Sequence, residues 1–115
     1  MLQRVDEQPL IDVCCLAPEV VTLREHLVES TEMLAALADP ARQDLVLLLA
    51  RTELNVTDLA ARIELSRPTV SHHLGILRRA GLVRARKRGK EVYYRLDKDQ
   101  IVRRLAGLIE SLTCC

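Results

Sequence analysis

The segment from Ser66 to Gly81, SRPTVSHHLGILRRAG, constrains the fold more than any other part of the sequence. Val70, Leu74 and Leu77 follow an i, i+4, i+7 spacing, which predicts an α-helix with one buried face. Ser66 is a favourable N-cap because its hydroxyl can accept a hydrogen bond from a free amide of the first turn. Gly81 follows two arginines and permits the left-handed backbone at which helices often end. The segment therefore predicts a well-delimited helix with one polar face.

Polar side chains lie away from the buried face at the N-terminal end of this helix. A helix end that presents hydrogen-bond donors and a cation suits the major groove of DNA, where base edges offer complementary groups. We therefore predict base-reading or helix-positioning roles for Arg67, Thr69, Ser71 and His72. A metal site is the alternative for the histidines. Neighbours on a helix do not share a face, which favours DNA contact for His72 and helix packing for His73.

A second short helix precedes this one. Residues Val56–Ile63 place Leu59 and Ala60 on one face, and Asn55 is a candidate N-cap. The connection through residues 64–66 leaves room only for a tight turn. A short helix, a tight turn and a capped helix with polar leading residues form the helix-turn-helix pattern.

After Gly81 the apolar period changes from helical to alternating, which predicts two strands at Leu82–Arg86 and Glu91–Leu96. Gly89 supplies the positive φ of a tight turn between them. Val92, Tyr94 and Leu96 are expected to face inward. The hairpin is interpreted as a wing whose cations contact DNA phosphates or the minor groove, and the alternative is a solvated turn. The predicted contacts are Arg86, Lys87, Arg88 and Lys90.

The segments on either side are predicted to form helices that pair two copies of the chain. One helix runs from Pro18 to about Asp39, and Asp39 and Pro40 can begin another that ends near Thr52. The last helix, about residues 98–113, can be capped by Asp97 and carries a heptad-like apolar stripe that is broader than a small domain needs on one side. An ordinary core-facing helix is the alternative. The predicted dimer interface includes Leu23, Leu27, Ile101, Leu105, Leu108 and Leu112.

These elements predict a mostly α-helical fold with a small β-hairpin. The expected architecture is a winged helix-turn-helix in residues 18–115, which forms a homodimer through its first and last helices. Residues 1–17 are expected to form an N-terminal arm that carries one pair of cysteines.

The net charge of +1 hides a separation of charge along the chain. Residues 1–61 hold four arginines and eleven acids, whereas residues 62–104 hold thirteen basic residues and four acids. A basic half of this kind is typical of proteins that bind a polyanion such as double-stranded DNA, and a solvated charged face is the alternative. The sequence shows neither a membrane-spanning run nor a signal peptide, so we expect a cytoplasmic protein without a membrane partner.

All four cysteines form two adjacent pairs, Cys14-Cys15 before the first helix and Cys114-Cys115 after the last. In a reducing compartment such thiols are read first as ligands or redox groups. Thiolates favour soft ions, and three of them suit arsenite or antimonite, whereas four suit Cd²⁺, Pb²⁺ or Zn²⁺ and two can hold Hg²⁺. The alternatives are a thiol-based redox switch, or incidental thiols near the chain ends.

Four motifs resemble the ArsR/SmtB family of winged-helix, metal-sensing repressors. They are LADPAR (Leu37–Arg42), ELNVTDLA (Glu53–Ala60), SRPTVSHHLGILRRAGLV (Ser66–Val83) and RKRGKEVYYRL (Arg86–Leu96). The resemblance implies a homodimer that binds a palindromic operator, blocks transcription of a resistance or efflux operon, and loses DNA affinity when an inducer binds. Within the family, sensors with adjacent cysteines often respond to arsenic, which makes arsenite the first choice of inducer.

The chain departs from the metal sites that the resemblance implies. Where many members carry a ligand cysteine at the start of the third helix, this sequence has Asn55. Other members bind zinc through carboxylates and histidines on the last helix. The matching positions here are Lys98, Gln100, Ser111 and Cys114, which cannot supply that ligand set.

An enzyme is the competing class of function. The sequence contains no CxxC motif at a helix start, no Gly-rich phosphate loop and no plausible nucleophile–base set. We therefore predict a non-enzymatic protein without an organic cofactor. A DNA-binding protein without an inducer is a third alternative.

Overall fold

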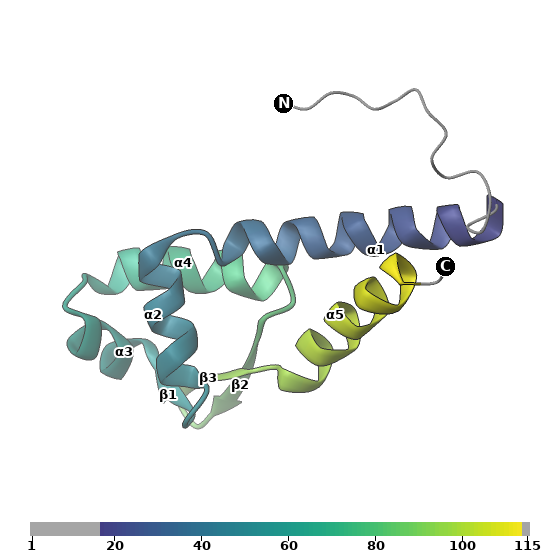
Figure 1. Cartoon of the computed structure of the whole chain (residues 1–115). Coiled ribbons are helices and arrows are strands. Elements are labelled where there is room, and N and C mark those ends of the chain that lie inside the picture. Colours follow the sequence, from purple (N-terminus) through teal and green to yellow (C-terminus); the bar gives the residue numbers. More distant parts are fainter. Residues whose placement is uncertain (1–16, 114–115) are drawn as a thin grey trace.

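The computed structural model describes residues 17–113, with their side chains from Leu23 onward (Figure 1). The elements in chain order are α1 (Ala17–Ala36), α2 (Pro40–Leu49), β1 (Leu54–Asn55), α3 (Val56–Ile63), α4 (Arg67–Arg79), β2 (Val83–Arg88), β3 (Glu91–Leu96) and α5 (Lys98–Leu112). The mostly helical winged helix-turn-helix predicted from the sequence is confirmed. The predicted N-terminal arm lies outside the described residues except for Ala17.

Each helix after α1 begins at a side-chain cap that the sequence predicted. Asp39 Oδ2 accepts hydrogen bonds from the Ala41 and Arg42 amides at 3.0 and 3.3 Å. The other caps make the equivalent bond to an amide of the first turn, which satisfies a donor that the helix leaves free. These caps are Asn55 for α3, Ser66 for α4 and Asp97 for α5.

The sheet has three antiparallel strands in the order β1-β3-β2. The two long strands and the Gly89 turn, with φ of 63°, were predicted, although β2 runs two residues further than expected. The third strand was not predicted. It comprises only Leu54 and Asn55, which pair with Tyr94 and Tyr93. This pairing joins the start of α3 to the hairpin.

The hydrophobic core lies under α4. Val70, Leu74 and Leu77 are at most 1% exposed, so the buried face predicted for this helix is confirmed. Apolar side chains from α1, α2, α3 and the sheet complete the core, and they include Met33, Ala36, Leu45, Leu49, Leu54, Leu59, Ala60, Leu82 and Val83. The helix-turn-helix is therefore held rigidly by packing on its inner side.

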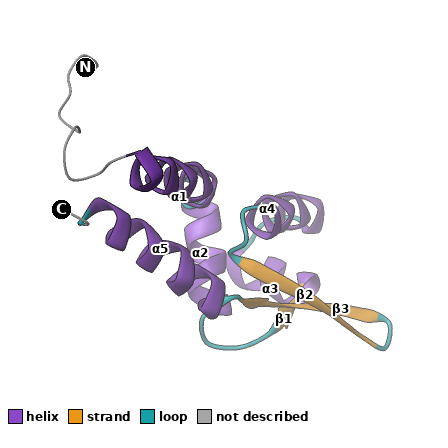
Figure 2. Ribbon diagram, turned by 90° about the vertical axis from the view of Figure 1, so that its right-hand side faces the viewer, coloured by secondary structure: helices purple, strands orange, loops and turns teal. Residues whose placement is uncertain are grey.

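Helices α1 and α5 lie side by side at one edge of this core (Figure 2). The buried positions of α1 are Ser30, Met33 and Ala36, whereas Leu27 and Leu34 are about half exposed. Within the described chain no side chain of α5 is fully buried. His26 Nδ1 lies 2.7 Å from Ser111 Oγ and links the two helices. These helices thus leave much of their apolar surface uncovered.

Candidate nucleic-acid interface

The N-terminal end of α4 presents polar side chains to solvent. Ser66 Oγ accepts from the Thr69 amide at 3.3 Å and lies 2.8 Å from Thr69 Oγ1, which fixes the first turn. Glu64 adopts a left-handed backbone, with φ of 58°, and so turns the chain sharply between α3 and α4. The four residues predicted to contact DNA are all exposed, and they are Arg67, Thr69, Ser71 and His72.

His73 has the opposite environment from His72. Its side chain is 14% exposed, and its Nδ1 lies 3.2 Å from Arg42 Nη1 and 3.9 Å from Asp39 Oδ2. Arg42 in turn donates from Nε to the Ala36 carbonyl at 2.6 Å. His73 therefore joins α4 to the corner between α1 and α2, which agrees with a packing role.

The wing, which is the β2–β3 hairpin of residues 83–96, distributes its cations between two faces. Arg86 and Arg88 lie on the face of the sheet that points away from the core, here called the outer face, because side chains alternate along a strand. Lys87 lies on the opposite face, and Lys90 follows Gly89 in the turn. Because β2 extends to Arg88, only Lys90 of the four predicted wing contacts lies in the turn.

The three residues predicted to face inward share one face of β3, but the core covers only two of them. Val92 is 38% exposed, because β3 extends beyond the core at this end, whereas Tyr94 and Leu96 do pack against the core. On the outer face the Arg88 guanidinium lies 4.3 Å from the centre of the Tyr93 ring. A cation over an aromatic face is favourable and restricts where Arg88 can point.

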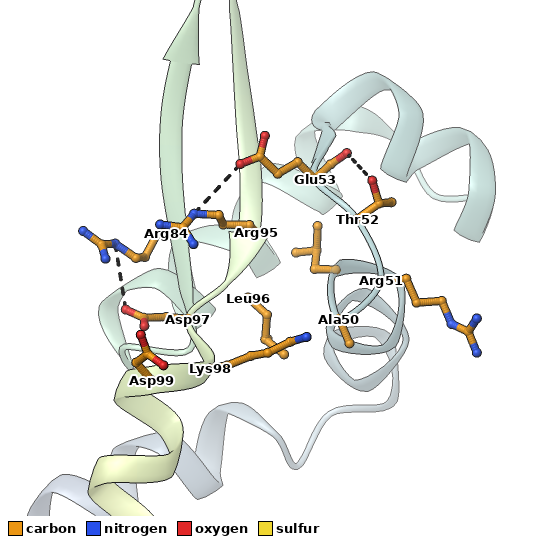
Figure 3. A pocket seen from close by; sticks show the side chains of 11 residues that line it. Ala50, Arg51, Thr52, Glu53, Arg84, Arg95, Leu96, Asp97, Lys98 and Asp99 are labelled. Atoms are coloured by element: carbon orange, nitrogen blue, oxygen red, sulfur yellow. Dashed lines mark hydrogen bonds and ion pairs between the residues drawn. The ribbon is translucent and has the colours of Figure 1, made fainter.

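The role of Glu53, which lies between α2 and β1, was not predicted from the sequence. Arg86 Nη2 donates to Glu53 Oε1 and Oε2 at 2.9 and 3.1 Å, and Arg88 Nη1 reaches Oε1 at 3.5 Å. The Arg95 Nε atom lies 3.9 Å from Oε2 (Figure 3). The carboxylate also lines a polar hollow of about 380 Å³ between the end of α2 and the start of α5.

Helix α5 is hydrogen-bonded to the C-terminal end of α4. Arg104 Nη1 donates to the Ala80 carbonyl at 2.9 Å, and Gln100 Nε2 donates to the Gly81 carbonyl at 3.5 Å. Gly81 has a φ of 82°, which strains any other residue, and a Cβ there would lie only 2.5 Å from Gln100 Nε2, so the end of the Gln100 side chain would have to move. A displacement of α5 would therefore act on α4.

The predicted metal ligands Cys14, Cys15, Cys114 and Cys115 lie outside the described residues. Among the described side chains, residues 23–113, no three His, Cys, Asp or Glu side chains gather as they would to hold a metal ion. The predicted interface residues lie on α1 and α5, with Leu27 and Leu112 exposed and Ile101 and Leu105 partly packed on the core. None of the described helices is long and apolar enough to cross a membrane.

An exposed, polar helix end, a sharp turn before it and a basic hairpin beside it define a winged helix-turn-helix protein. Residues 39–85 match the model of a family described as "Bacterial regulatory protein, arsR family". The chain is 42% identical over 99 residues to the "Transcriptional repressor SmtB homolog" of Synechocystis sp., and the match spans 84% of this chain and 74% of that protein. The chain therefore belongs to the arsR family, whose members are DNA-binding transcriptional regulators.

Other relatives carry more specific descriptions. The "Arsenical resistance operon repressor" of Escherichia coli is 46% identical over 67 residues, which is 57% of each chain. A solved structure described as "Reduced HlyU from Vibrio cholerae N16961" has a TM-score of 0.63 at 33% identity and spans 81% of this chain and 97% of that one. A homodimeric winged helix-turn-helix domain from Mycobacterium bovis has a TM-score of 0.66 at 26% identity, and the match spans 97% of this chain and 89% of that one.

Proposed function

We propose that the chain is a homodimeric repressor of a metal or metalloid resistance operon, and that a thiophilic ion releases it from its operator. The observation that carries the DNA-binding part is the capped N-terminal end of α4, which presents exposed polar side chains beside a basic wing. In this proposal the exposed residues of α4 read base edges or position the helix, and the wing cations contact phosphates.

The dimer is proposed to form through α1 and α5. Val28 and Leu34 of α1 and Val102, Ile109 and Leu112 of α5 are each more than half exposed in the single chain. Covering such apolar side chains with a second copy is favourable, and a homodimeric relative of the same fold supports the formation of a dimer. Two copies of α4 would then read the two halves of a palindrome.

The sensing site is proposed to consist of thiolates from Cys14, Cys15, Cys114 and Cys115. The relative described as an arsenical resistance operon repressor supports arsenite or antimonite as the first choice, with Cd²⁺, Pb²⁺ or Hg²⁺ as alternatives. The two cysteine pairs flank helices α1 and α5, which touch where Ser111 of α5 contacts His26 of α1. His26 lies nine residues, or about 14 Å along the helix, from Ala17 at the start of α1.

An ion can release the operator only if it binds the state that is incompetent for DNA more tightly than the competent state. We propose that ion binding shifts α1 and α5 so that the two copies of α4 are wrongly spaced. The hydrogen bonds from Arg104 and Gln100 to the end of α4 are the contacts that would carry this shift.

The test begins with DNA selected by the purified protein from a random-sequence pool. Arsenite, antimonite, Cd²⁺, Pb²⁺ and Hg²⁺ are titrated separately against the complex with the selected site. The wild-type protein is expected to release the DNA at the lowest concentration with arsenite or antimonite. Variants Cys14→Ser/Cys15→Ser and Cys114→Ser/Cys115→Ser are expected to stay bound, and a response by a variant that lacks both pairs would refute the sensing site.

A thiol-based redox switch in the same fold is the second candidate. It is favoured by the solved relative that is described as reduced HlyU. The same complex is treated with a thiol oxidant and then with a reductant. Release by the oxidant, with recovery by the reductant and with no response to any of the ions, would assign the signal to oxidation instead.

A further inference from the structure

We infer that Glu53 competes with DNA phosphates for the arginines of the wing and thereby limits the affinity of the protein for DNA. The inference rests on the proposed DNA-binding function. Glu53 Oε1 and Oε2 accept from Arg86 at 2.9 and 3.1 Å, and the carboxylate is also within ion-pair distance of Arg88 and Arg95. Three cations of the outer face thus share one anion.

The positions of these residues make the ion pairs exchangeable. Glu53 has 24% of its side chain exposed, whereas the arginine side chains are 57%, 54% and 49% exposed. Exposed ion pairs contribute little to folding stability, because water and salt screen them. A carboxylate and a phosphate accept from the same guanidinium donors, so a phosphate that approaches the outer face can take the place of Glu53 on Arg86.

The charge balance of the outer face supports competition between Glu53 and DNA phosphates. Arg84, Arg86, Arg88 and Arg95 all lie on this face, because Arg84 pairs with Arg95 in the register and side chains alternate along β2. Asp97 lies 3.9 Å from Arg84, and Glu53 is the anion shared by the other three. Neutralising Glu53 would therefore free cations that can release counterions from DNA.

A structural role for Glu53 predicts the opposite change in DNA affinity when Glu53 is removed. If Glu53 served to hold the wing against the segment between α2 and β1, its removal would loosen the wing and weaken DNA binding. If it competes with phosphate, its removal strengthens binding and steepens the dependence on salt. The sign of one change in affinity therefore separates the two roles.

The experiment compares Glu53→Gln with the wild-type protein on the selected DNA site over a series of salt concentrations. We expect Glu53→Gln to bind about three- to tenfold more tightly at low salt, since a few exposed ion pairs no longer oppose the contact. The slope of log affinity against log salt should steepen by roughly one unit for one added phosphate contact. Thermal melting by circular dichroism checks that the variant is folded.

Glu91→Gln is the matched control. Glu91 lies on the same outer face and its loss changes the net charge equally, but its Oε1 accepts from Asn55 Nδ2 at 3.2 Å, a bond that glutamine retains. We expect its affinity to change less than about twofold and its salt slope to stay the same, since no arginine is released. Adding Arg86→Ala to Glu53→Gln should remove most of the gain.

Unchanged or weaker binding by Glu53→Gln would overturn the inference, and so would an equal gain in Glu91→Gln. In either case the wild-type protein would still bind the selected site, and the proposed function would stand. If the wild-type protein selects no DNA and shows no salt-dependent binding, the proposed function and this inference both fail.

Discussion

The helix-turn-helix with its sheet and the α1–α5 pair differ in how completely a single chain covers them. In the first region Leu59, Val70 and Leu77 are not exposed at all, and the helix starts are capped by side chains. In the second region Val28, Val102 and Ile109 are each at least 60% exposed. The first region is therefore complete in one chain, whereas the second has apolar surface that a second copy can cover.

Under the proposed function, this difference gives the two regions two different tasks. A rigid, well-packed unit suits the recognition of a fixed DNA shape, because its side chains need no reordering on binding. A layer whose packing depends on a partner suits regulation, since a ligand can change how two copies are arranged. The contacts of Arg104 and Gln100 with the end of α4 connect the regions.

The largest expected effect is on stability. Leu74→Ala should lower the free energy of unfolding by about 2–5 kcal/mol, because it leaves a cavity under α4. Leu112→Ala, at a position 60% exposed in the single chain, should cost less than about 1 kcal/mol when the chain is monomeric. Urea unfolding measures both. Equal losses would contradict the contrast between the two regions.

The next effect is on assembly. Leu27→Glu should raise the dissociation constant of the dimer about 10- to 100-fold, because it buries a charge in the proposed α1–α5 interface. Leu47→Glu is the control, since Leu47 is 66% exposed on α2, away from that interface. Sedimentation velocity over a range of concentrations measures the constant. The interface is misassigned if the two variants dissociate alike.

A smaller effect is expected at the link between the regions. Arg104→Ala removes the donor to the Ala80 carbonyl, and Ala80 is only 1% exposed, so stability should fall by about 1 kcal/mol. Ion-induced release of DNA should weaken more than DNA binding itself. DNA affinity measured with and without arsenite tests this. If the ratio of the two affinities in Arg104→Ala equals that of the wild-type protein, Arg104 does not couple the two regions.

The smallest expected effect is on the wing. Lys87→Ala should weaken DNA binding only a few-fold and flatten the salt slope by about one unit, because one phosphate contact is lost. Lys98→Ala is the control, since Lys98 is an exposed cation at the start of α5. If the salt slope of Lys87→Ala equals that of the wild-type protein, the wing does not contact phosphate through Lys87.

Features that depend on neighbouring residues were predicted well from the sequence. The caps Asp39, Asn55, Ser66 and Asp97 and the buried face of α4 are set by side chains within one or two helical turns. The hairpin followed from its alternation and from Gly89. In each case a local rule of backbone geometry or periodicity was sufficient.

Features that depend on distant pairing were not predicted. Strand β1 has two residues, too few for an alternating pattern, and it exists because Leu54 pairs with Tyr94, forty residues away. The partners of Glu53 are 33 to 42 residues away, so no local spacing reveals them. Polar Ser30 of α1 is only 1% exposed, and its burial was not predicted because its side-chain type favours an exposed position. The cysteine site and the dimer interface stay predictions.

The most direct test of the division of tasks measures DNA affinity with and without arsenite for two variants on the same selected site. The account predicts that Arg67→Ala/Ser71→Ala loses affinity, whereas a variant with serine at all four cysteines binds like the wild-type protein and is not released by arsenite. Release of the four-serine variant at the same arsenite concentration as the wild-type protein would contradict the account.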